Sequence, residues 1–315
     1  QLIPQHPVIN GAVTLRVTGI TEEIVSFTWF KGPNTNSQYV ILTYIPGSRD
    51  PIVPDYLYNP RITAFSNGSL QIKDLQITDG GNYTVKMQTV ITSRDIFVYL
   101  TVYETVTKPK ITGPTTQPKE NDTVTLTCDT SKATTIRWTR RGAHISSEAK
   151  LSGDNKTLTL RALKRADSGE YRCEAENLVS KESSDPYKVS VAYGPDKAQI
   201  QGEFLVGLGS SITLTCSADS EPDPEYQWRF NGKALAQKAS KYVGNAETKD
   251  QGLYMCVMRN PVTLRTATVS VYVNVSADTI SEEYSHVGLA LGLASAIILG
   301  VVLIIVESFC LYKKF

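Results

Sequence analysis

The sequence has few of the residues from which catalytic and metal centres are built. Histidine occurs only 3 times, at His6, His144 and His286, and these positions lie far apart in the chain. There is no nucleophile–histidine–acid set, no group with metal-ligand spacing and no glycine-rich phosphate loop. The sequence therefore argues against an enzyme, and it predicts no catalytic residue, no metal and no cofactor.

An excess of charge of either sign is also absent. The chain has 32 Lys and Arg residues against 31 Asp and Glu residues, which gives a formal net charge of +1. Binding to nucleic acid relies on a strongly basic surface. The charge balance therefore predicts no nucleic-acid partner.

Cysteine is scarce, and its arrangement is informative. Of the 5 cysteines, Cys128 with Cys173 and Cys216 with Cys256 form two pairs, and Cys310 lies near the C-terminal end. The chain has Asn-x-Ser/Thr sequons at Asn67, Asn82, Asn121, Asn155 and Asn274. All of them precede one long apolar segment, which is typical of a glycosylated ectodomain. In that oxidising compartment, paired cysteines are expected to form disulfides.

The apolar segment covers residues 287–306 and contains no charged residue. A helix of this length crosses a hydrocarbon core of about 30 Å. Lys313 and Lys314 follow it and mark the cytoplasmic side. We expect a type I single-pass protein of the plasma membrane, with a stalk at 276–286, a tail at 307–315 and a signal peptide removed before Gln1.

Small residues recur every four positions in this segment, at Gly288, Gly292, Ala296 and Gly300. Such spacing lets two helices approach closely, so it suggests dimerisation in the same membrane, although the ordinary composition of membrane helices also explains it. Cys310 is a candidate for juxtamembrane lipidation, and the alternative is a free thiol.

A motif occurs three times along the ectodomain. TDGGNYTV (78–85), ADSGEYRC (166–173) and KDQGLYMC (249–256) each follow a tryptophan, which is Trp29, Trp138 or Trp228. Alternating strands precede these tryptophans, VTLRV (13–17), VTLTC (124–128) and ITLTC (212–216). Two cysteines that join packed sheets, a tryptophan packed on them and a tyrosine two residues before the second cysteine are the marks of an immunoglobulin domain.

The predicted fold class is therefore all-β, with three tandem immunoglobulin-like sandwiches at 1–105, 106–193 and 194–275 and one transmembrane helix. The tryptophan and the motif tyrosine are 54 residues apart in the first copy, against 33 and 26 in the others. This extra length predicts added C′ and C″ strands and a variable-type domain; the other two are of C2 or I type.

The first copy has valines where the others have cysteines, at Val17 and Val85. Both replacements are apolar, which predicts a core packed without a bridge. Arg61 and Asp79 are expected to form an ion pair under the E–F corner, and the alternative is that Arg61 faces solvent.

Five stretches of the chain carry a family resemblance: FTWFKG (27–32), NGSLQIKDLQITDGGNYTV (67–85), NKTLTLRALKRADSGEYRCEAENLVS (155–180), AYGPD (192–196) and NPVT (260–263). They resemble the carcinoembryonic-antigen family of cell adhesion molecules (CEACAM). The hepatocyte cell-adhesion family shares much of this pattern and is the alternative.

The resemblance implies cell–cell adhesion or recognition through the GFCC′ face of the first domain. Its implied partners are a second copy in trans, other immunoglobulin-superfamily surface proteins or microbial adhesins. Carried over by position, the face comprises Thr28, Phe30, Val40, Leu42, Lys86, Gln88, Ser93 and Asp95. Strand alternation independently predicts that Thr28, Phe30, Thr84 and Lys86 point outward if Trp29, Tyr83 and Val85 point inward. An exposed Phe30 would suit the centre of an interface, and the alternative is that local loops or glycans cover it.

The sequon at Asn82 departs from adhesive members of this family, because it lies on the predicted F strand. A glycan there would narrow or block a homophilic contact. Heterophilic recognition is therefore a second hypothesis, and a third is a membrane subunit that acts through its transmembrane helix.

Overall fold

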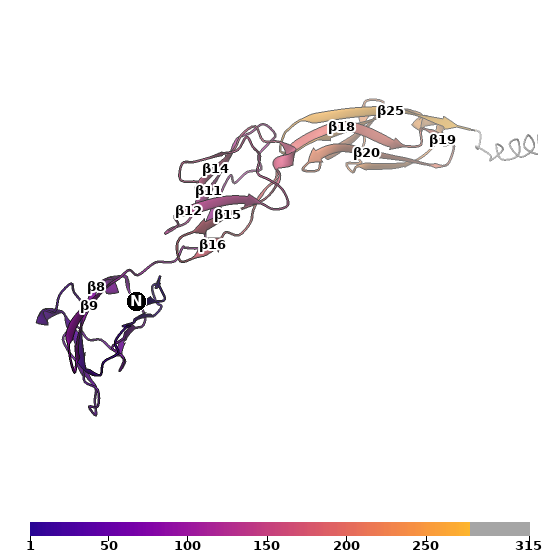
Figure 1. Ribbon diagram of the computed structural model, residues 1–315. Coiled ribbons are helices and arrows are strands. Elements are labelled where there is room, and N and C mark those ends of the chain that lie inside the picture. The colour runs from indigo at the N-terminus through magenta and orange to yellow at the C-terminus, as the bar shows by residue number, and fades with distance from the viewer. Residues whose placement is uncertain (278–315) are drawn as a thin grey trace, which may run out of the picture. The chain divides into compact units, whose positions relative to one another are not determined.

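The computed structural model describes residues 1–277 as an all-β chain (Figure 1). It divides into two compact units, Gln1–Val191 and the part that begins at Ala192. Residues 1–277 contain three separate hydrophobic cores, two in the first unit and one in the second. We refer to the sandwiches around these cores as the first, second and third domains.

The first domain is built from nine strands. They are β1 (Leu2–Ile3), β2 (Val13–Leu15), β3 (Ile24–Phe30), β4 (Val40–Tyr44), β5 (Ile52–Pro54), β6 (Ile62–Ala64), β7 (Leu70–Ile72), β8 (Gly81–Thr89) and β9 (Ser93–Leu100). One sheet has the order β1-β2-β7-β6 and the other β5-β4-β3-β8-β9. In immunoglobulin terms the second sheet is C″C′CFG, which is the variable-type arrangement.

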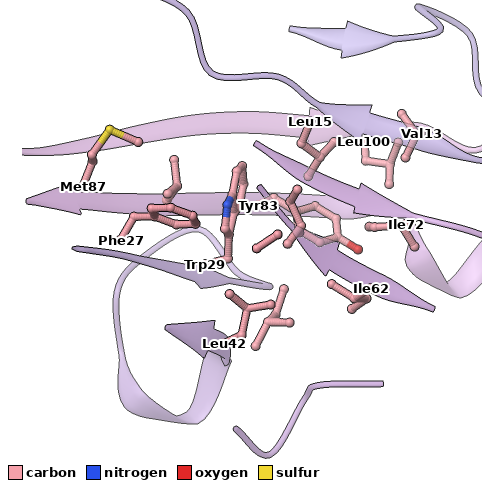
Figure 2. Packing of buried hydrophobic residues seen from close by; sticks show 14 of the residues in the cluster. Val13, Leu15, Phe27, Trp29, Leu42, Ile62, Ile72, Tyr83, Met87 and Leu100 are labelled. Atoms are coloured by element: carbon pink, nitrogen blue, oxygen red, sulfur yellow. The ribbon is translucent and has the colours of Figure 1, made fainter. Parts of the chain in front are cut away.

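The core of this domain lies between the two sheets (Figure 2). Trp29 from β3 lies opposite Val85 of β8, and both side chains are buried. The indole N–H of Trp29 donates to the carbonyl of Gly68, with the two atoms 3.0 Å apart. The tryptophan therefore packs against an aliphatic side chain here, and its one polar atom is satisfied by the backbone.

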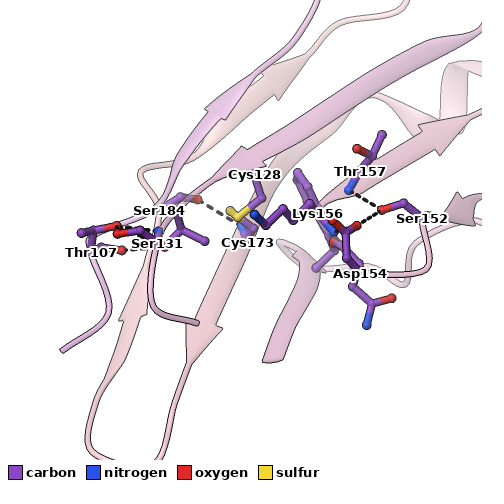
Figure 3. The surroundings of a disulfide bond; sticks show 12 residues. Thr107, Cys128, Ser131, Ser152, Asp154, Lys156, Thr157, Cys173 and Ser184 are labelled. Atoms are coloured by element: carbon purple, nitrogen blue, oxygen red, sulfur yellow. Dashed lines mark hydrogen bonds between the residues drawn. A yellow bond between two sulfur atoms is a disulfide. The ribbon is translucent and has the colours of Figure 1, made fainter. Parts of the chain in front are cut away.

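The second domain has two smaller sheets. Its strands are β10 (Lys110–Thr112), β11 (Val124–Asp129), β12 (Thr135–Arg140), β13 (Lys150–Leu151), β14 (Thr157–Leu160), β15 (Gly169–Glu176), β16 (Lys181–Ser183) and β17 (Tyr187–Val189). The sheets are β10-β11-β14-β13 and β12-β15-β16, with β17 also paired to β15. Cys128 on β11 is bonded to Cys173 on β15 (Figure 3). Cys173 lies opposite Trp138 of β12 in the strand register.

The third domain repeats this plan. Its strands are β18 (Tyr193–Gly202), β19 (Leu205–Gly207), β20 (Ser211–Glu221), β21 (Glu225–Phe230), β22 (Lys233–Ala234), β23 (Lys241–Asn245), β24 (Gly252–Arg259) and β25 (Thr266–Ser276). The sheets are β18-β20-β23 and β19-β25-β24-β21-β22. Cys216 is bonded to Cys256, which lies opposite Trp228. Both predicted disulfides are confirmed.

The repeated motif forms the same corner in each domain. Short 3₁₀ turns, η2 (Ile77–Asp79), η3 (Arg165–Asp167) and η4 (Thr248–Asp250), precede the F strands; a fourth, η1 (Ser37–Tyr39), precedes β4. The tyrosine hydroxyl donates to the carbonyl of the aspartate four residues earlier in all three domains. This contact is the tyrosine corner of immunoglobulin domains. Within residues 1–277, no helix has the length and apolar character to cross a membrane.

Candidate binding face of the first domain

The GFCC′ face is the outer surface of the sheet formed by β5, β4, β3, β8 and β9. Cross-strand register arranges its side chains in rows. One row is Phe97–Thr84–Phe30–Val40. The next row is Asp95–Lys86–Thr28–Thr43–Val53. Because successive side chains alternate, both rows lie on the side opposite to Trp29 and Val85.

The prediction that Leu42 belongs to this face is wrong, because its side chain is completely buried. Trp29 pairs with Leu42 and the next residue, Phe30, pairs with Val40, so β4 contains one extra residue, Ile41. Such a bulge reverses the alternation of the strand that carries it. Leu42 consequently turns into the core beside Trp29, as Figure 2 shows, while Val40 stays on the outer side.

The prediction that Phe30 is an exposed anchor is also wrong, since only 5% of it is accessible to solvent. Phe30 is not part of the core cluster, so it lies on the outer side as alternation requires. The chain that follows turns back at this point: the Lys31 amide donates to the carbonyl of Tyr39, and the Thr84 hydroxyl donates to that of Gly32. We attribute the burial of Phe30 and Thr84 to this returning segment.

The other predicted residues keep different degrees of exposure. Thr28 and Val40 are half-buried, and the hydroxyl of Thr28 lies 2.9 Å from that of Thr43. The exposed members are Lys86, Gln88, Ser93 and Asp95. Lys86 and Asp95 are direct cross-strand partners, so charges of opposite sign lie side by side near the middle of the face. The face is therefore polar on β8 and at the start of β9.

Two exposed aromatic residues were missed by the sequence analysis. Phe97 is 62% and Tyr99 is 64% accessible, and both lie on β9 on the outer side. The signal was present, because Leu100 is inward and alternation then sends Tyr99 and Phe97 outward. It was hidden because the stretch IFVYL is apolar throughout and shows no alternation of polarity.

Asn82 lies at the margin of the same face. It is exposed on β8, and its cross-strand partner is Tyr99. Phe97 is the next outward side chain along β9, opposite Thr84. The sequon asparagine and the two exposed aromatic side chains therefore occupy adjoining positions.

The tip of the β8–β9 hairpin adds a second apolar feature. Val90 and Ile91 are exposed there. The carboxylate of Glu22 accepts hydrogen bonds from the hydroxyls of Thr89 and Thr92, and the Thr89 bond is the main reason that the pKa of Glu22 lies below its ordinary value. The hairpin is thus fixed at its base while its tip is open to solvent.

Arg61 and Asp79 form a two-pronged ion pair at the opposite end of the domain. Nη1 and Nη2 of Arg61 lie 2.6 and 2.9 Å from the two carboxylate oxygens of Asp79. The backbone amide of Gln76 also donates to this carboxylate. Burial alone raises the pKa of Asp79, but the hydrogen bonds from Arg61 and Gln76 outweigh it and leave the pKa below its ordinary value. The corner is therefore charged and fully paired.

The five sequons differ in their structural setting. Asn82 and Asn274 lie on strands β8 and β25, whereas Asn67, Asn121 and Asn155 lie in turns between strands. All are exposed except Asn155, which is half-buried. The predicted dimerisation residues Gly288, Gly292, Ala296 and Gly300, and the lipidation candidate Cys310, lie outside the described residues.

Comparison with known proteins gives the chain a family. The family model of the immunoglobulin V-set domain matches residues 6–103, and two immunoglobulin-domain models match residues 108–177 and 205–277. The cell adhesion molecule CEACAM16 of Rattus norvegicus is 28% identical over 291 residues, which cover 88% of this chain and 69% of that protein.

Two solved structures agree. The crystal structure of murine CEACAM1b has a TM-score of 0.51 and 29% identity, over 60% of this chain and 97% of that one. A chain in the crystal structure of mouse coronavirus receptor-binding domain complexed with its murine receptor has a TM-score of 0.53 and 30% identity, over 61% of this chain and 98% of that one. Such relatives are adhesion molecules rather than enzymes, and they support a role in cell adhesion or recognition. The chain therefore belongs to the carcinoembryonic-antigen-related cell adhesion molecule family of the immunoglobulin superfamily.

Proposed function

We propose that this protein is a type I glycoprotein of the plasma membrane that mediates cell–cell adhesion or recognition through the GFCC′ face of its first domain, with homophilic binding favoured. The observation that carries the proposal is the exposure of Phe97 on a face that also presents Lys86 and Asp95. Exposed aromatic side chains are frequent anchors of protein interfaces. Phe97 thus takes the place of Phe30 and Leu42 as the apolar part of the face.

The charges on this face suit a symmetric contact between two copies. In a twofold interface the same patch meets itself, so each residue of one copy contacts a partner position of the other. Lys86 and Asp95 are adjacent and opposite in charge, so a twofold rotation near them brings lysine to aspartate in both directions. Such complementarity fixes the register of an interface more than it adds affinity.

The membrane part of the proposal rests on residues 287–306, where the sequence alone supports a transmembrane helix. Gly288, Gly292, Ala296 and Gly300 would let two such helices associate in cis, and Cys310 would take a lipid at the inner boundary. Anchoring of this kind concentrates the first domains of many copies on one cell, which strengthens weak trans contacts by avidity.

A heterophilic receptor is the second candidate function, and Asn82 favours it. A glycan at this exposed asparagine would occupy the margin of the GFCC′ face, where a second copy has to approach. A different partner could use the part of the face that remains, at Lys86, Asp95 and Val53. One related solved structure contains a murine receptor bound to a viral domain, so heterologous binding occurs among similar proteins.

A cell-mixing experiment tests the proposal. Labelled cells that express the full chain are mixed with unlabelled cells that do or do not express it, and the Phe97→Arg variant is compared with wild type. Phe65→Arg is the matched control, because Phe65 is an exposed phenylalanine of the same domain in the turn between β6 and β7. We expect clusters of expressing cells only, lost with Phe97→Arg and kept with Phe65→Arg.

Clustering that survives Phe97→Arg would show that the face does not carry the adhesion. Recruitment of non-expressing cells by wild type would favour the heterophilic receptor.

A further inference from the structure

Two of the five sequons lie on sheet faces, and each has an exposed tyrosine beside it. Asn82 on β8 lies directly opposite Tyr99 on β9, which is 64% accessible. Asn274 on β25 follows Tyr272 by two residues, so both point to the same side of the sheet, and Tyr272 is 53% accessible. The three sequons in turns do not lie on a sheet face.

Each of these tyrosines belongs to a larger apolar patch. Phe97 is the neighbouring outward residue of Tyr99 on β9. In the third domain, Leu253 lies opposite Tyr272, and Leu205 lies opposite Asn274 itself. Leu205 is 55% and Leu253 is 39% accessible. The sequon asparagine is therefore at the edge of an exposed apolar patch in the first domain and within one in the third.

Geometry allows the sugar attached at these positions to reach the aromatic ring. Directly opposite residues of a sheet have Cβ atoms about 4.5–5.5 Å apart, and residues i and i+2 of one strand are about 6.6 Å apart. The first N-acetylglucosamine on an asparagine extends beyond that distance. Its ring has an apolar face of C–H groups, which suits the face of an aromatic side chain.

We propose that N-glycans are attached at Asn82 and Asn274 and that their first sugars pack on Tyr99 and on Tyr272 with Leu205 and Leu253. The occupant beside each of these tyrosines is thus the chain's own carbohydrate. This accounts for large apolar side chains on the open sides of two sheets, because surface apolar clusters usually mark a contact.

The attachment at Asn82 must precede folding. Thr84, the third residue of that sequon, is buried, and its hydroxyl donates to the carbonyl of Gly32. An enzyme that has to engage this hydroxyl meets it only before β8 joins the sheet. The glycan is therefore in place when Tyr99 takes its position on β9.

The consequence for binding rests on the proposed function. A glycan folded onto Tyr99 covers one margin of the GFCC′ face and leaves Phe97 and the row from Asp95 to Val53 open. Removing it would expose Tyr99 and widen the approach to Phe97. The Asn82→Gln variant should then cluster cells more strongly than wild type in the mixing experiment.

The packing itself is tested without any partner, by tyrosine-directed chemical labelling of the full chain on sparsely expressing cells. Peptide mass spectrometry gives the glycan occupancy of each sequon and the labelling rate of each tyrosine. We compare wild type with Asn82→Gln and Asn274→Gln. Asn121→Gln removes a sequon in a turn as a control, and Tyr56, which is 89% accessible, is the internal reference.

We expect Asn82→Gln to raise labelling of Tyr99 several-fold and to leave Tyr272 unchanged, and Asn274→Gln to do the reverse. Asn121→Gln should change the labelling of neither tyrosine, and Tyr56 should be labelled equally in every variant. Unoccupied sequons at Asn82 and Asn274, or equal labelling with and without the glycan, would overturn the inference. These outcomes do not depend on adhesion, so failure of the proposed function leaves the test intact.

Discussion

The first and second domains build the same core position with different chemistry. In the second domain Trp138 lies opposite Cys173, which is bonded to Cys128 on the facing sheet. In the first domain Trp29 lies opposite Val85, and Val17 is only partly buried beyond the end of β2. The register around the tryptophan is the same, so the bridge is not required to align these strands.

What differs is the facing strand. β11 covers Val124–Asp129 and includes its cysteine, whereas β2 covers Val13–Leu15 and ends before Val17. The side chain of Met87 fills space near this position, because an added Cβ on Gly68 would lie against Met87 and close to Val17. Where the second domain has a covalent link, the first domain thus has aliphatic packing, and the Arg61–Asp79 pair lies at its corner.

The largest expected effect comes from removing the disulfide of the second domain, a bond that the first domain lacks. Replacing Cys128 and Cys173 by alanine should lower the free energy of unfolding of the second domain by about 2–5 kcal/mol, because the unfolded chain gains freedom. Hydrogen exchange of β15 measures this, and β8 in the same molecule is the internal control. Equal loosening of β8 would show that the first domain depends on the bridge of its neighbour.

Breaking the corner of the first domain should have the next largest effect. Arg61→Met leaves the buried carboxylate of Asp79 without its cation. The Arg61 side chain is 23% accessible, so we expect a loss of about 2 kcal/mol rather than the ~3–5 kcal/mol of a fully buried pair. Hydrogen exchange of β8 is the measurement. Arg16→Met, at an exposed position, should change little, and an equal effect there would contradict a role for the pair.

Trimming the valine that stands in for a cysteine should cost somewhat less. Val85→Ala removes two methyl groups from a completely buried site, which corresponds to about 1.5 kcal/mol. The same substitution at the exposed Val90 serves as the control. Domain-resolved exchange of β3 and β8 reports the loss; an unchanged first domain would mean that Val85 does not support the core.

The smallest effect is a dependence on pH. An Asp carboxyl in the unfolded chain has a pKa of about 3.9, and the folded-state pKa of Asp79 lies below this. The contribution of Asp79 to the free energy of unfolding is therefore fully present above the unfolded pKa and is lost as the pH falls through the folded pKa. The stability difference between wild type and Arg61→Met should therefore shrink as the pH is lowered below about 4. Denaturant titrations across this pH range give the difference in the free energy of unfolding between the two proteins. A difference that does not change with pH would exclude a contribution from the titration of Asp79.

Much of the fold could be predicted because its signals are local or repeated. The spacing of cysteine, tryptophan and tyrosine identifies the sandwich, since each residue has one role in a fixed strand. The length between Trp29 and Tyr83 indicated the added strands, which are β4 and β5. The candidate face was predicted less well, because exposure on a sheet depends on register and on what covers it.

The sequence by itself determined the three sandwiches, the two disulfides and the tyrosine corners, since these follow from residue type and spacing. Only the tertiary structure decided which side chains reach the surface. The extra residue Ile41 turned Leu42 inward, the segment after Phe30 returned to cover it, and pairing of β8 with β9 set Asn82 against Tyr99. Each depends on the exact register of paired strands or on how a segment folds back, which residue order alone does not specify.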